Sequence, residues 1–216
     1  MKKILMTTAV CALLSVVASA QLSFGVRASY SPTVNPRTDA LLINPGIPET
    51  EALFNADKVK YPGQIGVTAR YDMDHFWFMS ELMYGYNKTT YSKRNTYNYT
   101  EFPTTTEYFT VSSGYLELPV TAGVKLGIVE IFSGLYLDGR IHGQNDLTQI
   151  DGYRDDSAWL KGGWLSGIGV NLDPVLVDIR YQQLFTNYGK DQYLNGQELL
   201  LKNAPARMTV SAAFMF

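Results

Sequence analysis

A set of charged side chains recurs at alternate positions along predicted β-strands, and these residue types are the ones able to do chemistry. Its members are Arg27, Arg70, Glu81, Glu117, Lys125, Asp138, Arg140, Lys161, Asp178, Arg180 and Arg207. If the strands close into a narrow barrel, these groups share its lumen. They would then either line a selective pore or pair with one another as a plug. Because buried charges must be paired, we favour the plug.

Histidine suggests a second chemistry at the rim of such a barrel. Lipid hydrolases and acyltransferases of the outer membrane combine a histidine with a serine and a carboxylate. His142 lies near Asp146 in sequence, and Ser29 or Ser157 would have to supply the nucleophile. No spacing in the chain fixes such a triad, and His75 falls beside a predicted short turn. We therefore expect a protein without catalytic activity.

The third candidate is a group of carboxylates in one predicted loop. Asp146, Asp151, Asp155 and Asp156 offer the oxygen ligands that calcium prefers. Their spacing does not match an EF-hand loop, which places ligands at fixed alternate positions. We therefore expect a solvated loop, with no metal site and no cofactor.

These residues depend on strands that are predicted from strict alternation, with a period of two. The predicted strands cover about Leu22–Tyr30, Gln64–Tyr71, His75–Asn87, Thr110–Leu126, Ile131–His142, Ala158–Leu172, Val175–Thr186 and Ala206–Phe216. On each of them one face is apolar and lacks Asp, Glu, Lys and Arg, while the charged set occupies the other face. A soluble barrel would show the same period with the two faces exchanged.

The amino terminus favours an exported protein. Met1-Lys2-Lys3 precedes an apolar run and Ala18-Ser19-Ala20, which is the pattern of a secretory signal peptide. We expect residues 1–20 to be that signal, used by the general secretory route, and residues 21–216 to form one domain. Cys11 is the only cysteine, so the mature chain has no disulfide. No later segment is apolar enough for a membrane helix, and a net charge of −2 argues against binding nucleic acid.

The connections between the strands alternate in length. Residues 72–74, 127–130 and 171–174 are short connections, whereas residues 31–63, 88–109, 143–157 and 188–205 are long ones. This pattern predicts an all-β fold: an eight-stranded antiparallel up-and-down transmembrane β-barrel with short periplasmic turns and four long extracellular loops. The second long loop is rich in Tyr and Thr. It is either a recognition surface or a hairpin that continues its two strands above the membrane.

One stretch of the chain is similar to a known family. Tyr115-Leu116-Glu117-Leu118-Pro119-Val120, then Gly123-Val124-Lys125, then Phe132-Ser133-Gly134-Leu135-Tyr136-Leu137 resembles the PorT-like outer-membrane β-barrel family of Bacteroidota. The resemblance implies an eight-stranded barrel. The protein that gives the family its name is associated with type IX secretion and gliding, so the resemblance also implies a link to secretion.

Together these patterns predict an integral protein of the bacterial outer membrane that is not an enzyme. We expect a structural role, or surface interactions through its extracellular loops. The alternatives are a narrow porin-like channel and a lipid-modifying enzyme at the rim. The expected partners are outer-membrane lipid, the outer-membrane assembly machinery, and other envelope proteins or surface ligands that bind the loops.

Overall fold

The structure is a computed structural model that describes residues 22–34, 41–43, 51–96, 106–187, 190–194, 196–198 and 206–216. The predicted signal peptide, residues 1–20, lies outside these ranges. Among the described residues, no helix is long and apolar enough to cross a membrane.

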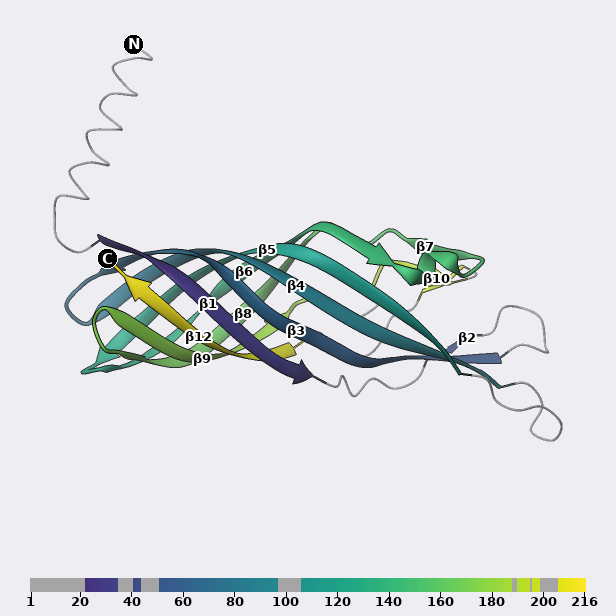
Figure 1. The fold of residues 1–216 in the computed structure, drawn as a ribbon, viewed down its shortest axis with the longest axis horizontal. Coiled ribbons are helices and arrows are strands. Elements are labelled where there is room, and N and C mark those ends of the chain that lie inside the picture. Colours follow the sequence, from purple (N-terminus) through teal and green to yellow (C-terminus); the bar gives the residue numbers. More distant parts are fainter. Residues whose placement is uncertain are drawn as a thin grey trace, which may run out of the picture.

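The described chain is almost entirely β-structure. Its elements are β1 (Leu22–Val34), β2 (Leu41–Ile43), β3 (Glu51–Asp72), β4 (Phe76–Thr96), β5 (Thr106–Leu126), β6 (Val129–Asn145), the 3-10 helix η1 (Asp146–Gln149), β7 (Tyr153–Asp155), β8 (Leu160–Asn171), β9 (Val175–Leu184), β10 (Gln192–Leu194), β11 (Gln197–Glu198) and β12 (Ala206–Met215). The main sheet has the order β1-β12-β9-β8-β6-β5-β4-β3-β2, and β1 also pairs with β3. That pairing closes the sheet into an antiparallel barrel of eight strands, with β2 attached to β3 outside the ring (Figure 1).

The barrel strands agree with the predicted ones near the short turns. Near the long loops β1, β3, β4, β5 and β6 exceed the predicted bounds, whereas β8 and β9 fall two residues short of them. β3, β4 and β5 contain 22, 21 and 21 residues, whereas β9 and β12 contain 10 each. The pairing of β4 with β5 continues as far as Arg94 and Thr106. Of the two interpretations of the Tyr- and Thr-rich segment, the described residues support the hairpin that prolongs the two strands, and a recognition surface stays a prediction (Figure 1).

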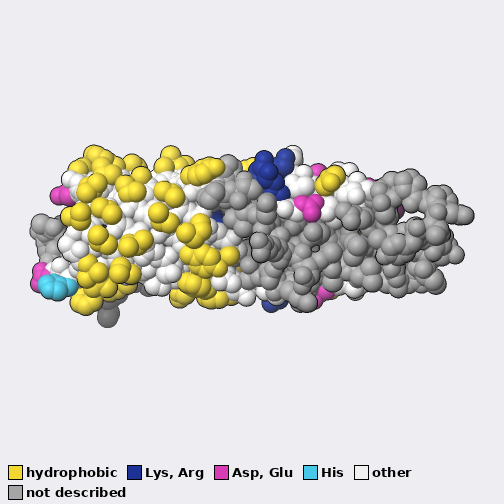
Figure 2. Space-filling view, turned by 90° about the horizontal axis from the view of Figure 1, so that it is seen from below, with side chains coloured by type: hydrophobic (Ala, Val, Ile, Leu, Met, Phe, Trp, Pro, Cys, Tyr) yellow, Lys and Arg dark blue, Asp and Glu magenta, His cyan; other side chains and the backbone are white. Residues whose placement is uncertain are grey.

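The apolar face of each barrel strand points away from the axis. On β5, for example, Leu116, Leu118, Val120, Val124 and Leu126 are all exposed. On the face in view, Figure 2 shows such side chains as a broad band across the short-turn half of the molecule. A closed ring leaves no unpaired strand edge, so it can present this band to lipid without exposing backbone polar groups.

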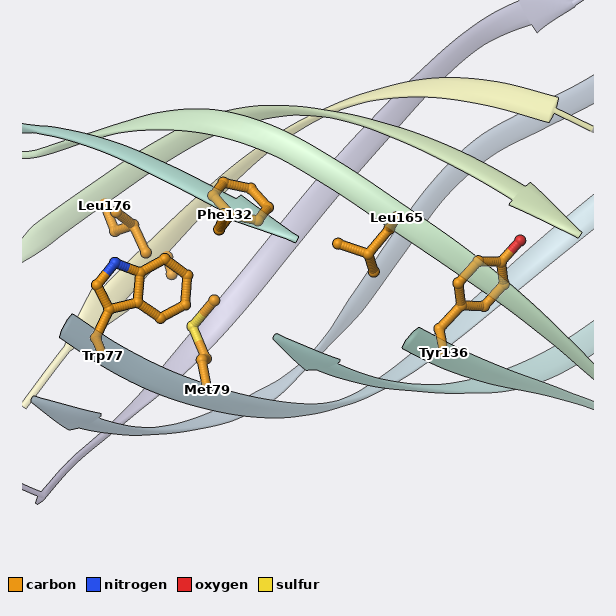
Figure 3. Packing of buried hydrophobic residues seen from close by; sticks show 7 residues of the cluster. Trp77, Met79, Phe132, Tyr136, Leu165 and Leu176 are labelled. Carbon is orange, nitrogen blue, oxygen red and sulfur yellow. The ribbon is translucent and has the colours of Figure 1, made fainter. Parts of the chain in front are cut away.

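The lumen of the barrel is packed with side chains. A hydrophobic cluster in it contains Trp77, Met79, Phe132, Tyr136, Leu165, Leu176 and Ala213. Figure 3 shows Trp77, Met79, Phe132 and Leu176 together, with Leu165 and Tyr136 farther along. The alternation placed these residues on the inner face, but the sequence interpretation treated that face as mainly charged. The structure shows an apolar core beside the charges.

Inward aromatic rings stand opposite glycines on neighbouring strands. The register pairs Trp77 with Gly123, Tyr115 with Gly85, Phe132 with Gly167 and Tyr136 with Gly163. A Cβ built at any of these four glycines would lie within 2.6 Å of an atom of its aromatic partner. An eight-stranded barrel leaves room only for side chains in its interior. The missing side chain of each glycine therefore provides the space for a large ring.

The two ends of the barrel differ in construction. At one end the β5–β6 turn is tight, with Gly127 at a φ of 70°, and β1 meets the end of the last strand where the backbone N–H of Phe216 donates to the carbonyl oxygen of Phe24 at 2.8 Å. At the other end β7, β10 and β11 form a second small sheet. Leu147 and Leu194 are buried in this long-loop region. The third and fourth long connections are thus joined by strand pairing.

Candidate functional site: the charged lumen

Most of the predicted charged set lies inside the barrel, because alternate residues of a strand point to opposite faces. Buried members are Arg27, Arg70, Glu81, Glu117, Asp178, Arg180 and Arg207. Lys125, Asp138 and Lys161 are partly buried, and Arg140 is exposed. The buried charges fall into three clusters, which we name central, loop-side and turn-side.

The central cluster joins Arg27 and Arg180 to Glu81 and Asp178. Arg180 donates from Nη1 and Nη2 to the two carboxylate oxygens of Glu81, both at 3.1 Å, and from Nε to Asp178 Oδ1 at 3.0 Å. Arg27 pairs with Asp178 and lies 3.4 Å from Glu81. Ser211 connects the groups, since it accepts from Arg27 at 3.1 Å and donates to Asp178 at 2.8 Å. Two cations face two carboxylates, so the cluster is neutral.

The loop-side cluster is built around Glu117 and Arg207, which form an ion pair. Gln182 donates to Glu117 Oε1 at 2.6 Å and accepts from Arg207 Nε at 2.9 Å. Gln64 donates to Glu117 Oε2 at 3.1 Å, and the Tyr115 hydroxyl accepts from Arg207 Nη1 at 3.0 Å. The Glu117 carboxylate and the Arg207 guanidinium therefore each have an uncharged hydrogen-bond partner in addition to the opposite charge.

The turn-side cluster closes the opposite end of the lumen. Arg70 makes a bidentate contact with Glu130 at 2.8 and 2.6 Å and another with Asp72 at 2.9 and 2.8 Å. Lys125 Nζ lies 2.7 Å from Asp72, and the Arg70 guanidinium carbon lies 4.6 Å from the centre of the Trp77 ring. This cluster also contains two cations and two carboxylates.

Glu130 is a member that the sequence interpretation missed. It was assigned to a turn of residues 127–130, but β6 begins at Val129 and points Glu130 into the lumen with 1% exposure. The alternation along β6 could have identified this residue, because Glu130 lies at an even position and therefore shares the inner face with Phe132 and Tyr136.

The remaining predicted charges lie toward the long loops and are not paired in the same way. Asp138 is the register partner of Glu117 on β5 and of Lys161 on β8. Among the described residues, neither Asp138 nor Lys161 takes part in an ion pair. Arg140 Nη1 lies 3.2 Å from Asp155 at the rim. A cavity of about 140 Å³ opens at this level, lined in part by Asp138, Lys161 and Trp159.

The rim residues considered for catalysis are dispersed. His142 Nδ1 accepts from the backbone N–H of Gly114 at 3.2 Å, and its Nε2 lies 3.4 Å from the Tyr84 hydroxyl. Ser29 donates to Gln64, and Ser157 donates to Asp155. The structure thus brings neither candidate serine together with His142 by a hydrogen bond.

The loop carboxylates likewise have separate roles. Asp146 accepts from the backbone N–H of Thr110 at 3.1 Å, and Asp156 pairs with Arg154 at 2.7 Å. Burial raises the pKa of Asp155, but hydrogen bonds from Ser157 and the charge of Arg140 outweigh it, so the pKa is lowered below its usual value. Within the described part of the chain, no three potential metal-ligating residues gather.

Few buried polar atoms in the lumen lack hydrogen bonds. Among the described residues, the buried side-chain nitrogen and oxygen atoms without a hydrogen bond are Arg27 Nη1, Thr68 Oγ1 and Trp77 Nε1. Arg27 Nη1 still lies close to a carboxylate. Hydrogen bonding of nearly all buried polar atoms is typical of a folded interior. The described lumen is therefore packed and hydrogen-bonded in the manner of a protein core.

A closed antiparallel barrel with an apolar outer band and paired charges inside is a transmembrane β-barrel protein. The sequence agrees with this class, since residues 18–188 match the family described as the outer membrane protein beta-barrel domain. The chain belongs to that family and is an integral protein of the outer membrane. No curated protein matches the chain. By the rule for such barrels, the short turns are periplasmic and the long connections extracellular.

Proposed function

We propose that this protein is a non-catalytic membrane anchor that presents an extracellular β-sheet to a partner in the envelope or at the cell surface. One observation carries the proposal: β3, β4 and β5 continue as paired strands well beyond the apolar band. Closing a hairpin needs only 2–5 residues. The extra length is not required for insertion into the membrane, and a rigid sheet is a suitable surface for recognition.

The free edge of β5 supports a partner that binds by strand addition. The pairing of β5 with β6 ends at Val111 and Asn145. Among the described residues, the segment from Thr106 to Phe109 therefore has a strand neighbour only on the β4 side. Unpaired N–H and C=O groups of such an edge can pair with an extended segment of another protein. Tyr108 on this segment is 69% exposed and offers contact area.

The alternatives receive less support. Paired charges and the apolar cluster fill the lumen, which disfavours a porin-like channel, and the dispersed rim residues disfavour a lipid-modifying enzyme. The resemblance to the PorT-like family would place the partner among envelope proteins that take part in secretion. That placement is part of the proposal.

The test replaces Ser92–Tyr108 by Asn-Gly. Tyr91 and Phe109 are register partners, so they become the pair that closes a two-residue turn. The shortened barrel should insert and still migrate faster unheated than boiled. Co-purification from the native envelope in mild detergent should then lose the partners that the full chain retains.

A substitution elsewhere on the extracellular side serves as the control. Arg154→Ala changes an exposed residue of the second sheet and should leave the co-purified partners unchanged. Unchanged partners after the hairpin replacement would refute the proposal. A large, stable conductance of the full-length protein in a planar bilayer would favour the channel.

A further inference from the structure

Three lysines on the outer face of β3 and β4 form a group that we name the lysine ladder: Lys58, Lys60 and Lys88. Lys60 and Lys88 are direct register partners, and Lys58 lies two residue pairs farther along the strands, opposite Thr90. All three lysines are exposed. Residues directly opposite on antiparallel strands share a face, and the even-numbered residues of this part of β4 face outward. The ladder therefore points away from the lumen.

This arrangement is electrostatically unfavourable for the protein alone. Like charges directly opposite on a pair of strands are destabilising. Among the described residues, the lysines in ion pairs are Lys93 with Glu107 and Lys125 with Asp72, and no carboxylate pairs with the ladder. Even Asp57, adjacent to Lys58 in sequence, forms no such pair. A negative charge brought from outside the described chain would relieve this repulsion.

The position of the ladder indicates the source of that charge. Tyr84 and Tyr86 precede Lys88 on the same face of β4, are 43% and 41% exposed, and fall where the extracellular aromatic girdle of a barrel is expected. With a rise of roughly 3.4 Å per residue, Lys88 lies about 7 Å beyond Tyr86 along the strand. That is the depth of the lipid headgroups. On the face that Figure 2 shows, Lys and Arg side chains also gather at the loop-side edge of the apolar band.

We propose that the lysine ladder binds the phosphorylated headgroup of an outer-leaflet glycolipid. Each lysine ammonium offers three donors and a compact positive charge, which suits a phosphate. A phosphate between Lys60 and Lys88 turns their repulsion into two attractions and ties β3 to β4 at the membrane surface. The acyl chains of the same lipid lie along the apolar band. This site is independent of any partner of the extracellular hairpin.

The binding test uses the purified barrel in neutral detergent with three probes: phosphorylated lipid A, dephosphorylated lipid A and inorganic phosphate. Phosphorylated lipid A should raise the unfolding midpoint of the wild type and remain bound in native mass spectrometry. The other two probes should do neither at the same concentration. The variant K58Q/K60Q/K88Q should bind the phosphorylated lipid about tenfold more weakly or worse, because each basic residue near an anionic surface contributes substantially.

Three further variants separate charge from structure. K58R/K60R/K88R keeps the charges and should keep the binding, and Lys190→Gln, which removes an exposed lysine elsewhere, should bind like the wild type. The single variant Lys60→Gln should raise the unfolding midpoint in neutral detergent, because it relieves the repulsion from Lys88. In phosphorylated lipid A the same variant should unfold below the wild type. A structural role alone predicts no such reversal.

Three outcomes would overturn the proposal. The triple glutamine variant could bind phosphorylated lipid A as tightly as the wild type. Dephosphorylated lipid A could bind equally well, which would assign recognition to the sugar or the acyl chains. Inorganic phosphate alone could reproduce the shift, which would indicate a free-anion site instead of a lipid site.

Discussion

Cross-strand glycines and buried ion pairs together determine how residues fill this lumen. The four rings opposite glycines occupy space that a Cβ would deny them. The charged clusters fill the rest and are individually neutral. Neither feature is visible in one strand alone, because both depend on which residues become neighbours across the sheet.

At the same scale, the ion pairs predict that removing the carboxylate of Glu117 and removing that of Asp138 will lower the free energy of unfolding by different amounts. Glu117→Ala should lower the free energy of unfolding by about 3–5 kcal/mol, because it removes the carboxylate that forms the buried ion pair with Arg207. Asp138→Ala should cost less, since Asp138 has no ion pair within the described chain. Urea titration of the folded barrel in detergent would measure both. Equal losses would contradict the distinction between the two sites.

Gly123 provides a test of the aromatic–glycine pairs. A Cβ there would lie 2.5 Å from the Trp77 ring, so Gly123→Ala should cost about 1–3 kcal/mol through overpacking. Trp77→Leu combined with Gly123→Ala should cost less than the sum of the two single changes. Gly139→Ala is the matched control, because its nearest neighbour lies at 3.5 Å. A neutral Gly123→Ala variant would show that the ring has freedom to move.

At the scale of elements, the structure divides each long strand into two parts. Inside the membrane one face meets lipid and the other meets the lumen. Beyond the apolar band the hairpin has no lipid to face: Tyr108 on its outer face is 69% exposed, while Tyr91 on its inner face is buried within the protein. The extracellular end is further organised by the β7–β10–β11 sheet, which joins two long connections.

The turn that follows β7, in which Asp155 accepts hydrogen bonds from Ser157, should depend on acid pH. The pKa of Asp155 is lowered below its usual 3.8 when folded, so its stabilising contribution is complete above 3.8 and disappears as pH falls toward the folded pKa. The Ser157 amide donates to Asp155 Oδ1 at 3.0 Å and reports on this change. An NMR titration of that amide in detergent should give a midpoint below 3.8. Asp155→Asn should abolish the response, and a midpoint above 3.8 would contradict the shift.

On the scale of the whole molecule, the outer face of each strand meets lipid within the apolar band and water beyond it. Val120 and Tyr108 lie on the same face of β5, 53% and 69% exposed, but only Val120 lies within the apolar band. The two side chains therefore differ in whether membrane surrounds them, and not in how they pack against the rest of the protein.

This difference leads to a matched pair of substitutions. Val120→Arg should destabilise the inserted barrel by about 2–4 kcal/mol, the cost of arginine on the lipid face near the midplane. Tyr108→Arg should leave the free energy of unfolding almost unchanged. Unfolding titrations in lipid vesicles would measure both. Similar values for the two variants would mean that the band does not face lipid.

The alternation predicted the barrel because lipid excludes charge from one face, as on β5 from Leu116 to Leu126. It failed above the membrane, where the sequence Lys88–Thr96 is polar on both faces and gives no period. Most charged residues of the lumen could be predicted individually, with Glu130 and Asp72 as the exceptions. Their partners could not, since the contact between Glu81 and Arg180 depends on the stagger of strands far apart in the chain.

The length of β5 has a consequence for how the protein meets its surroundings. From Leu116 at the edge of the band to Thr106, the strand continues for roughly ten residues, which is roughly 30 Å before tilt is considered. The headgroup layer occupies about 5–7 Å of that height. The tip of the sheet therefore stands clear of the lipid surface. Antibodies, or molecules on a facing cell, can reach it without approaching the bilayer.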